Sequence, residues 1–332
     1  MRVFSLTMLI LGGFIGAGFA SGREVANYFS RFQEYSILAI VVAVIILFFL
    51  VYLFLILSDR FNGYIGFINQ YFGRLGGLVN FLFAVSLLII IASMFAGCGV
   101  VAESYNLNEN FVIILTAILA FFSCAKDVKL IDKINRILVP FIMLIIVFVC
   151  LGFNTKNYGS NNSIFYSIFS GANYIFINIV TLGLFILEIG KNYTKKDKIV
   201  ASLLVSAIIG IILFVFNNAI IYNDLVFGIM PTITLSKMKG NFVYFLTIIS
   251  IWLALFTTLV SNLYILCTYT SKFIKNKYVN LAVMIGVGVI VSFFGFDTMV
   301  NYIYSFIGAV GIIVIVNIIV QEKRRKIFSS LE

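Results

Sequence analysis

The chain has 332 residues, of which 62% are hydrophobic and 11% are charged, and its formal net charge is +10. This composition excludes a soluble globular protein and indicates a bundle of membrane-spanning helices of about 20 residues each. The positive charge does not indicate a nucleic-acid partner, because the basic residues stand in short clusters between apolar runs and form no single patch. Histidine is absent, which removes the commonest metal ligand and the usual nucleophile–base pair, so an enzyme is not expected.

The first apolar run, residues 3–30, is long enough to cross a bilayer but is interrupted by five glycines. Each glycine costs a helix roughly 1 kcal/mol relative to alanine, so their accumulation predicts a break at membrane depth. Unwound backbone at that depth is tolerated only where protein or a watery cavity satisfies its polar groups. A break therefore indicates a binding site of the kind found in secondary transporters. The alternative is an unbroken helix with a glycine packing face, formed from Gly12, Gly13, Gly16, Gly18 and Gly22.

A break in this helix would expose backbone at Gly16, Ala17 and Gly18. Its unpaired N–H groups would attract a carboxylate, and its unpaired C=O groups would attract a cation. Ser21 adds a hydroxyl, and the glycines, Gly22 included, allow a ligand to approach closely. A zwitterionic amino acid carries both charges, so we expect these residues to bind an amino acid.

Glu24 follows the glycines, and an ionisable residue inside a membrane is a functional candidate. It could accept a proton, pair with a substrate amine, form a structural salt bridge, or lie in water at the interface. The adjacent Arg23 points roughly 100° away on a helix, so it is not the expected partner. Because the chain has no histidine, a carboxylate must carry any coupled proton.

Nine further apolar runs follow the first one, which gives about ten predicted transmembrane helices. If the N-terminus faces the cytoplasm, that side receives 18 Lys and Arg residues and the other side receives 5. This asymmetry satisfies the positive-inside rule and predicts a multi-pass protein of the cell membrane with both termini in the cytoplasm. The runs are 35–57, 76–103, 109–125, 134–153, 171–189, 199–223, 242–270, 278–296 and 299–320.

Ten spans divide into two five-helix halves, residues 3–153 and residues 171–320. Because five is odd, a duplicated half must insert upside down, which predicts an inverted repeat within a single membrane domain. The sixth span is then the partner of the broken first one, and its polar centre from Asn178 to Gly183 suggests a second break. We expect Asn178 and Thr181 to contribute to the substrate site. The alternative is an unbroken helix with small residues that serve packing.

The third and eighth spans hold further candidates. Gly97 in the third would allow another helix or a ligand to approach closely. In the eighth, Thr257 and Ser261 lie one turn apart, so their hydroxyls could complete an oxygen shell around a small hard cation. The alternative is that these side chains bond back to their own helix.

Three features lie near the ends of spans. Glu188 and Asp297 are either interfacial or take part in gating. The connection between Asp224 and Gly240, which contains Pro231, is either a lid over an outward cavity or a simple loop.

The segment Gly16-Ala-Gly-Phe-Ala-Ser-Gly22, followed by Glu24, resembles the start of the YkvI-type family of amino-acid permeases. That family belongs to the amino acid–polyamine–organocation superfamily, which has the LeuT-like fold. Two positions depart from the family pattern, since Arg23 replaces an uncharged polar residue and Ser305 replaces a proline. The similarity recurs at Ala96-Gly97 through Glu103, at Phe256-Thr-Thr258, and at Gly295-Phe296 through Tyr304, Gly308 and Gly311.

This resemblance implies a five-plus-five inverted repeat in which helices 1 and 6 are discontinuous around a central site. By analogy with sodium symporters of the same fold, it also implies a sodium position. The residues of that position would be the backbone near Ile15 and Gly18 together with Thr257, Thr258 and Ser261.

Taken together, the residues and the resemblance predict an all-α membrane protein that transports a small solute by alternating access. The expected solute is an amino acid, the expected coupling ion is sodium or a proton, and no other cofactor is expected. The main alternative is a sensor of the same fold, such as a membrane subunit of a spore-germinant receptor, which binds a small molecule without transporting it. The oligomeric state and the direction of transport are left open.

Overall fold

The computed structural model describes residues 2–329 except 62, 126–128, 154–162 and 192. For some residues inside helices only the backbone is described, namely 17, 63–65, 69, 129–137, 180, 181, 188, 305 and 324–329. In this part of the chain the protein is all helical. The helices of the first half are α1 (Arg2–Phe14), α2 (Ala17–Ser21), α3 (Arg23–Tyr28), α4 (Ser36–Leu57), α5 (Gly63–Phe72), α6 (Gly76–Ser104), α7 (Glu109–Ala125) and α8 (Lys129–Cys150). Two short 3₁₀ helices, η1 (Ser30–Tyr35) and η2 (Gly73–Leu75), precede α4 and α6.

The rest of the described chain is also helical. Its helices are α9 (Ile164–Ile189), α10 (Lys195–Tyr222), α11 (Pro231–Met238), α12 (Asn241–Thr270), α13 (Lys277–Ser292), α14 (Phe296–Thr298) and α15 (Tyr304–Ser329). A π-helical turn, η3 (Met299–Ile303), joins α14 to α15.

Among the described residues, five helices are long and apolar enough to cross a membrane, namely α4, α6, α10, α12 and α15. Five shorter apolar helices accompany them, in α1, α7, α8, α9 and α13. Helix α4 is apolar on all sides, with Ala43 and Leu47 buried and Val41 and Ile45 exposed. An exposed face as apolar as the buried face is what a lipid-facing helix requires.

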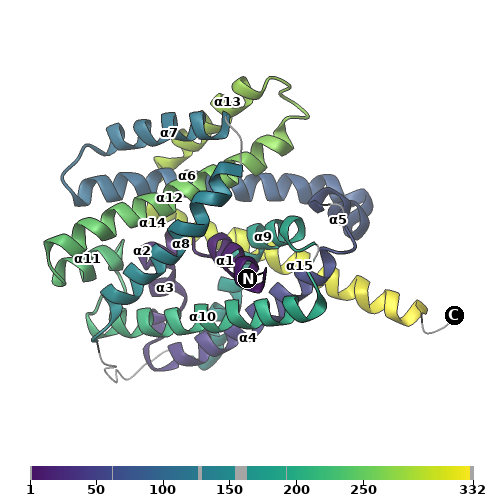
Figure 1. Ribbon diagram of the computed structural model, residues 1–332, viewed down its shortest axis with the longest axis horizontal. Helices are drawn as coiled ribbons and strands as arrows, with labels where there is room; N and C mark the ends of the chain where they lie inside the picture. The colour runs from purple at the N-terminus through teal and green to yellow at the C-terminus, as the bar shows by residue number, and fades with distance from the viewer. Residues whose placement is uncertain (1, 62, 126–128, 154–162, 192, 330–332) are drawn as a thin grey trace.

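Helix α1 lies near the middle of the bundle (Figure 1). It packs against α8, α9 and α10, while α4 packs on α9 and α10, and α6 packs on α12. Helices α7 and α13 cover the far side of α6. The first segment is therefore enclosed by protein, which is the setting in which unwound backbone is tolerated.

The predicted break in the first segment is confirmed. Helix α1 ends at Phe14, Ile15 and Gly16 are not helical, and α2 begins at Ala17. Gly16 is extended, with φ −86° and ψ −177°. A second bend follows at Gly22, whose φ of 81° places it in the left-handed region, which glycine adopts without steric cost.

The predicted break in the sixth span is wrong, because α9 runs as one helix from Ile164 to Ile189. The Asn178 amide donates from Nδ2 to the Tyr174 carbonyl oxygen at 3.0 Å, one turn back in the same helix. A Cβ on Gly183 would lie 2.7 Å from the ring of Phe54. This glycine therefore serves the close packing of α9 on α4 and does not interrupt the helix.

Two helices fall in segments where the sequence predicted none. Helix α5 lies between the second and third spans, and α11 lies in the connection that was expected to be a lid or a loop. Pro231 opens α11 at the first helical positions, where its missing N–H and fixed φ favour helix initiation. Helix α11 also touches the broken segment, because the Thr232 hydroxyl donates to the Ala20 carbonyl oxygen at 2.7 Å.

Lys198 is completely buried at the start of α10. Its Nζ donates to the Leu55 carbonyl oxygen at 2.7 Å and forms an ion pair with Asp59 at 2.6 Å. The ammonium thus caps the end of α4, where a positive charge is favoured by the helix dipole.

We expect Lys198→Met, which keeps the volume and removes the charge, to lower the free energy of unfolding by about 1 to 3 kcal/mol, because the buried Leu55 carbonyl loses its donor. Thermal unfolding of the purified protein in detergent measures this. Lys195→Met on the same helix is the matched control, since Lys195 is exposed. Equal unfolding temperatures for the two variants would contradict the capping role.

Candidate functional site

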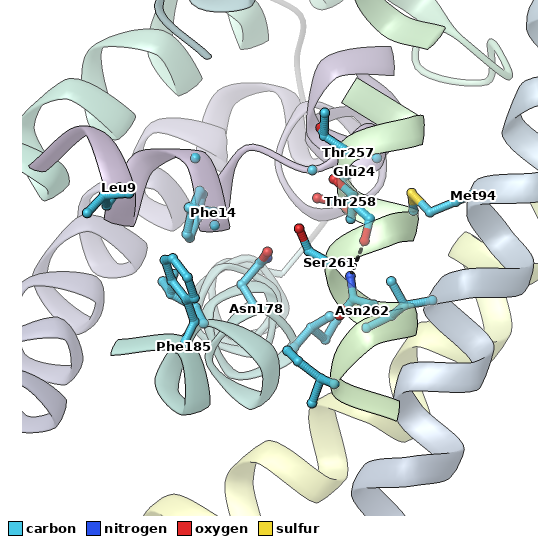
Figure 2. A pocket seen from close by; sticks show the side chains of 18 of the residues that line it. Leu9, Phe14, Glu24, Met94, Asn178, Phe185, Thr257, Thr258, Ser261 and Asn262 are labelled. Atoms are coloured by element: carbon cyan, nitrogen blue, oxygen red, sulfur yellow. Dashed lines mark hydrogen bonds between the residues drawn. The ribbon is translucent and has the colours of Figure 1, made fainter. Parts of the chain in front are cut away.

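A cavity of about 110 Å³ lies beside the break in the first segment, and residues from α1, α3, α6, α9, α12 and α15 line it. Glu24, Thr257 and Thr258 gather at one end of it, and Leu9, Phe14 and Phe185 lie toward the other (Figure 2). The sequence-predicted site residues that line it are Gly16, Gly18, Glu24, Asn178, Thr257, Thr258 and Ser261.

The two glycines of the break form one wall of the cavity. A Cβ on Gly16 would be 3.7 Å from Thr258 Cγ2, so the extended backbone lies directly against α12. A Cβ on Gly18 would overlap the carboxyl group of Glu24. Gly18 therefore leaves the space that the Glu24 side chain occupies.

Glu24 is 7% exposed and lines the cavity from α3. It forms no salt bridge with any residue that the structure describes. The Tyr174 hydroxyl is buried beside it, and the phenols of Tyr28 and Tyr304 are within its electrostatic reach. Within the described part of the chain, the burial of Glu24 and its lack of an ion pair fit neither a structural salt bridge nor a solvated interfacial residue.

Arg23 points away from Glu24, as predicted. Its guanidinium forms an ion pair with Asp297 and donates to the Gly228 carbonyl oxygen at 2.9 Å and to Asn301 Oδ1 at 3.1 Å. Asn27 donates to the same Asn301 oxygen. These bonds tie α3 to the segment before α11 and to η3, which meets α14 at the start of the last span.

A second and larger cavity, of about 870 Å³, lies on the Arg23 side of α3. Arg23, Asn27, Tyr28 and Asn301 are among the residues that line it. Arg23 lines the larger cavity, and Glu24, the next residue of α3, lines the smaller one.

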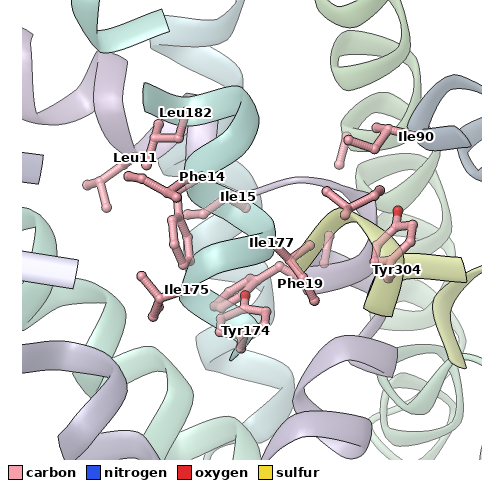
Figure 3. Packing of buried hydrophobic residues seen from close by; sticks show 14 of the residues in the cluster. Leu11, Phe14, Ile15, Phe19, Ile90, Tyr174, Ile175, Ile177, Leu182 and Tyr304 are labelled. Carbon is pink, nitrogen blue, oxygen red and sulfur yellow. The ribbon is translucent and has the colours of Figure 1, made fainter. Parts of the chain in front are cut away.

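Aromatic rings pack against one another around the break in the first segment. The ring of Tyr174 lies 5.9 Å from that of Phe14, 5.6 Å from that of Tyr28 and 5.1 Å from that of Phe29, measured between centroids. Figure 3 shows Tyr174 in this cluster with Phe14, Phe19 and Ile15 around the break. Ile15 itself is buried, at 3% exposure, and does not line the small cavity.

On the opposite wall, α12 supplies the polar residues that the sequence singled out. The Thr257 hydroxyl donates to the Ala254 carbonyl oxygen at 3.2 Å, and Asn262 Nδ2 donates to the Thr258 carbonyl oxygen at 2.7 Å. Thr257 and Asn262 therefore bond back to their own helix and also line the cavity. Ser261 and Asn178 face each other across it (Figure 2).

Three of the predicted substrate residues, Ser21, Gly22 and Gly97, lie outside the cavity. The Ser21 hydroxyl donates to the Gly18 carbonyl oxygen at 3.0 Å and accepts from the Arg23 N–H at 3.3 Å, so it stabilises the bend at Gly22. A Cβ on Gly97 would lie 2.6 Å from Leu255 Cδ2, which shows that Gly97 serves the packing of α6 on α12. The side chains of Ala17, Thr181 and Glu188 fall outside the described part of the chain.

The sequence reasoning missed Tyr304 and Tyr174 as site residues. Tyr304 lines the cavity from α15 and shares a 2.7 Å hydrogen bond with the Ser93 hydroxyl of α6. A tyrosine in the middle of an apolar span is the signal that could have found both, because a buried phenol requires a polar neighbour.

Comparison with known proteins supports the membrane assignment. No family model matches the chain. It is 24% identical over 319 residues to the uncharacterized protein YyaD of Bacillus subtilis (93% of this chain and 94% of YyaD), and 22% identical over 344 residues to the uncharacterized membrane protein YkvI of the same organism (97% and 96%). The chain is a distant homologue of YyaD and YkvI.

Solved structures of secondary transporters share its fold. The nucleobase-cation-symport-1 family transporter Mhp1, closed with bromovinylhydantoin bound, matches with a TM-score of 0.64 at 15% identity, over 90% of this chain and 74% of Mhp1. A manganese transporter mutant of Eremococcus coleocola matches at 0.63 and 11%, over 95% and 77%. A Na⁺-coupled sialic acid symporter matches at 0.58 and 14%, over 94% and 75%. The chain is therefore an integral multi-pass membrane protein of the LeuT-like fold.

We expect Gly22→Ala to destabilise the protein by at least about 1 to 2 kcal/mol, because an L-residue resists the left-handed conformation. The added Cβ would also lie 2.8 Å from the ring of Phe216. Gly286→Ala is the matched control, since that position is helical and open. Thermal unfolding compares the two, and a Gly22→Ala variant as stable as Gly286→Ala would show that the bend is not required.

Proposed function

We propose that this protein is a secondary transporter of the cell membrane that moves a small solute with an amino group by alternating access, with amino acids as the first class to test. One observation carries the proposal. A buried carboxyl group with no salt bridge among the described residues, Glu24, lines a small cavity at a helix break, and its neighbour Arg23 lines a larger cavity. Ionisable residues in such positions mark transport pathways. The solved neighbours are named for chemically different ligands, so the fold leaves the cargo open.

The order of the elements supports the proposed inverted repeat of residues 3–153 and 171–320. In each half one short helix stands between the second and third spans, α5 in the first half and α11 in the second. We place both termini in the cytoplasm on the basis of the loop charges. The larger cavity then opens to the outside, and the Arg23–Asp297 ion pair closes the path from it to the smaller cavity.

The proposed coupling ion is sodium or a proton. The backbone at Ile15 and Gly18 with the hydroxyls of Thr257, Thr258 and Ser261 forms the proposed sodium position. Thr258 adjoins the extended Gly16 and lines the same cavity as Ser261, which supports this assignment. Glu24 is the carboxylate that a proton would use.

We expect Glu24→Gln to abolish gradient-driven uptake into proteoliposomes, because the variant carries neither charge nor exchangeable proton at the break. Uptake of a panel of radiolabelled amino acids under a sodium gradient and under a pH gradient measures this. Glu34→Gln, at an exposed carboxylate, is the matched control. Unchanged uptake in Glu24→Gln, or no gradient-dependent uptake of any amino acid by the unmodified protein, would contradict the proposal.

Removal of the Arg23–Asp297 ion pair tests whether this pair closes the path between the two cavities and so acts as a gate. In a background without Cys98, Cys124, Cys150 and Cys267, we expect Arg23→Gln to raise the labelling of Ser261→Cys by an impermeant thiol reagent several-fold from the outside. Arg60→Gln, which removes the separate Arg60–Glu322 pair, should leave that labelling unchanged. Equal labelling in the two variants would exclude Arg23 as the gate.

The unbroken α9 favours one alternative, a receptor of the same fold that binds a small molecule without transporting it. Transport on this fold uses two discontinuous helices, and here the described structure contains only the first. Ligand-induced stabilisation with no uptake under any gradient would identify the receptor.

A further inference from the structure

The small cavity has one ionisable side chain and no described basic side chain that could compensate its charge. Glu24 is the only Asp, Glu, Lys or Arg among the described residues that line it. The nearest cation along the chain, Arg23, is bound to Asp297 on the other side of α3. A charge of this kind in a low-dielectric site is costly until a ligand or a proton compensates it.

The groups around Glu24 include oxygen acceptors that suit a cation, and no described basic side chain lines the cavity to bind a carboxylate. The hydrogen of the Thr257 hydroxyl is committed to the Ala254 carbonyl, so its oxygen presents lone pairs. The amides of Asn178 and Asn262 each direct an N–H to a carbonyl of their own helix. A substrate carboxylate at the break would also meet the Glu24 carboxyl group, which already fills the space beside Gly18.

The rest of the cavity is apolar. A Cβ on Gly13 would lie 3.0 Å from Leu182 and 3.2 Å from Phe185, which places both side chains against α1 one turn before the break. The cavity thus runs along α1 from an apolar end at Gly13 to a charged end at Gly18. Its volume of about 110 Å³ accommodates a molecule of a few heavy atoms.

A metal ion fits these walls less well. Among the described residues no three His, Cys, Asp or Glu side chains gather in one place, and a single carboxylate is a poor site for a divalent ion. An alkali ion would neutralise Glu24 but would leave the apolar end without an occupant.

We infer that the cavity binds a small amphiphilic ammonium ion, with its protonated amine against Glu24 and a short alkyl chain between Leu182 and Phe185. This refines the proposed function, on which it rests for the role of the cavity as the cargo site. A primary amine without a carboxylate then binds more tightly than the amino acid that has the same side chain.

Three probes that share one carbon chain test the assignment by calorimetry on the full-length purified protein. They are isopentylamine, leucine and 4-methylpentanoate, in an amine-free potassium buffer at pH 7, where a primary amine is protonated. We expect isopentylamine to bind roughly tenfold or more tightly than leucine, because the carboxylate of leucine would lie against the Glu24 carboxyl group. We expect 4-methylpentanoate not to bind, since it lacks the ammonium group and its charge-assisted hydrogen bond, which is worth about a factor of ten or more. Leucine binding as tightly as isopentylamine would overturn the assignment.

Two variants locate the ends of the ligand. Glu24→Gln should weaken isopentylamine binding at least tenfold, and Glu34→Gln should leave it unchanged. Gly13→Val narrows the apolar end without touching Glu24, so it should weaken isopentylamine binding more than ethylamine binding. It also provides a test if Glu24→Gln does not fold. Equal loss for both amines in Gly13→Val, or no loss in Glu24→Gln, would overturn the proposed pose.

Sodium distinguishes the two sources of positive charge. Replacing potassium by sodium should weaken isopentylamine binding, because a sodium ion at Thr257, Thr258 and Ser261 lies in the same cavity and would compete with the ammonium ion for the charge of Glu24. The amine assignment therefore goes with a proton, not sodium, as the coupling ion. Glu24-dependent binding of sodium with no binding of any amine would assign the site to the metal ion instead. Uptake separates the proposals. Isopentylamine binding through Glu24 without uptake supports the amine site and removes the transport function. Leucine uptake that Glu24→Gln abolishes, with no binding of isopentylamine, supports the transport function and removes the amine site.

Discussion

The backbone of the first segment cannot continue as one helix through Ile15–Gly16 and Gly22, and the rest of the site depends on these two bends. The first exposes backbone against Thr258 of α12. The second reorients the chain so that α3 presents Arg23 to one cavity and Glu24 to the other. These two adjacent residues of opposite charge therefore have different surroundings, and among the described residues only Arg23 forms an ion pair.

The part of the broken segment that follows the break, α2 and α3, is held by residues from far along the chain. The Thr232 hydroxyl binds the Ala20 carbonyl, and Arg23 binds carbonyls at Val226 and Gly228. These contacts satisfy polar groups that a short helix leaves without partners. The connection before and within α11 thus replaces the hydrogen bonds that a continuous helix would have supplied.

The sequence predicted features that local chemistry determines. The glycine cluster lowers the helix propensity of the first segment locally, and the angular separation of Arg23 from Glu24 follows from consecutive positions on a helix. The unbroken α9 could not be predicted from the sequence, since the role of Gly183 depends on Phe54 of α4. The structural role of Ser21 could not be predicted either. Its hydrogen bonds to Gly18 and Arg23 form only when the chain bends at Gly22, so the sequence assigned its hydroxyl to the ligand. Tyr304 and Asp297 are distant in sequence, so only the fold brings them to this site.

The ion pair between Arg23 and Asp297 has a consequence for how the protein is made. Inserting a charged residue at the centre of a membrane helix costs about 2.5 to 3.5 kcal/mol on translocon scales, and the first segment holds two of them next to a glycine cluster. Its charged partner is encoded near the other end of the chain, which a ribosome reaches on the order of half a minute later. The broken segment therefore reaches its final environment only after Asp297 has been made.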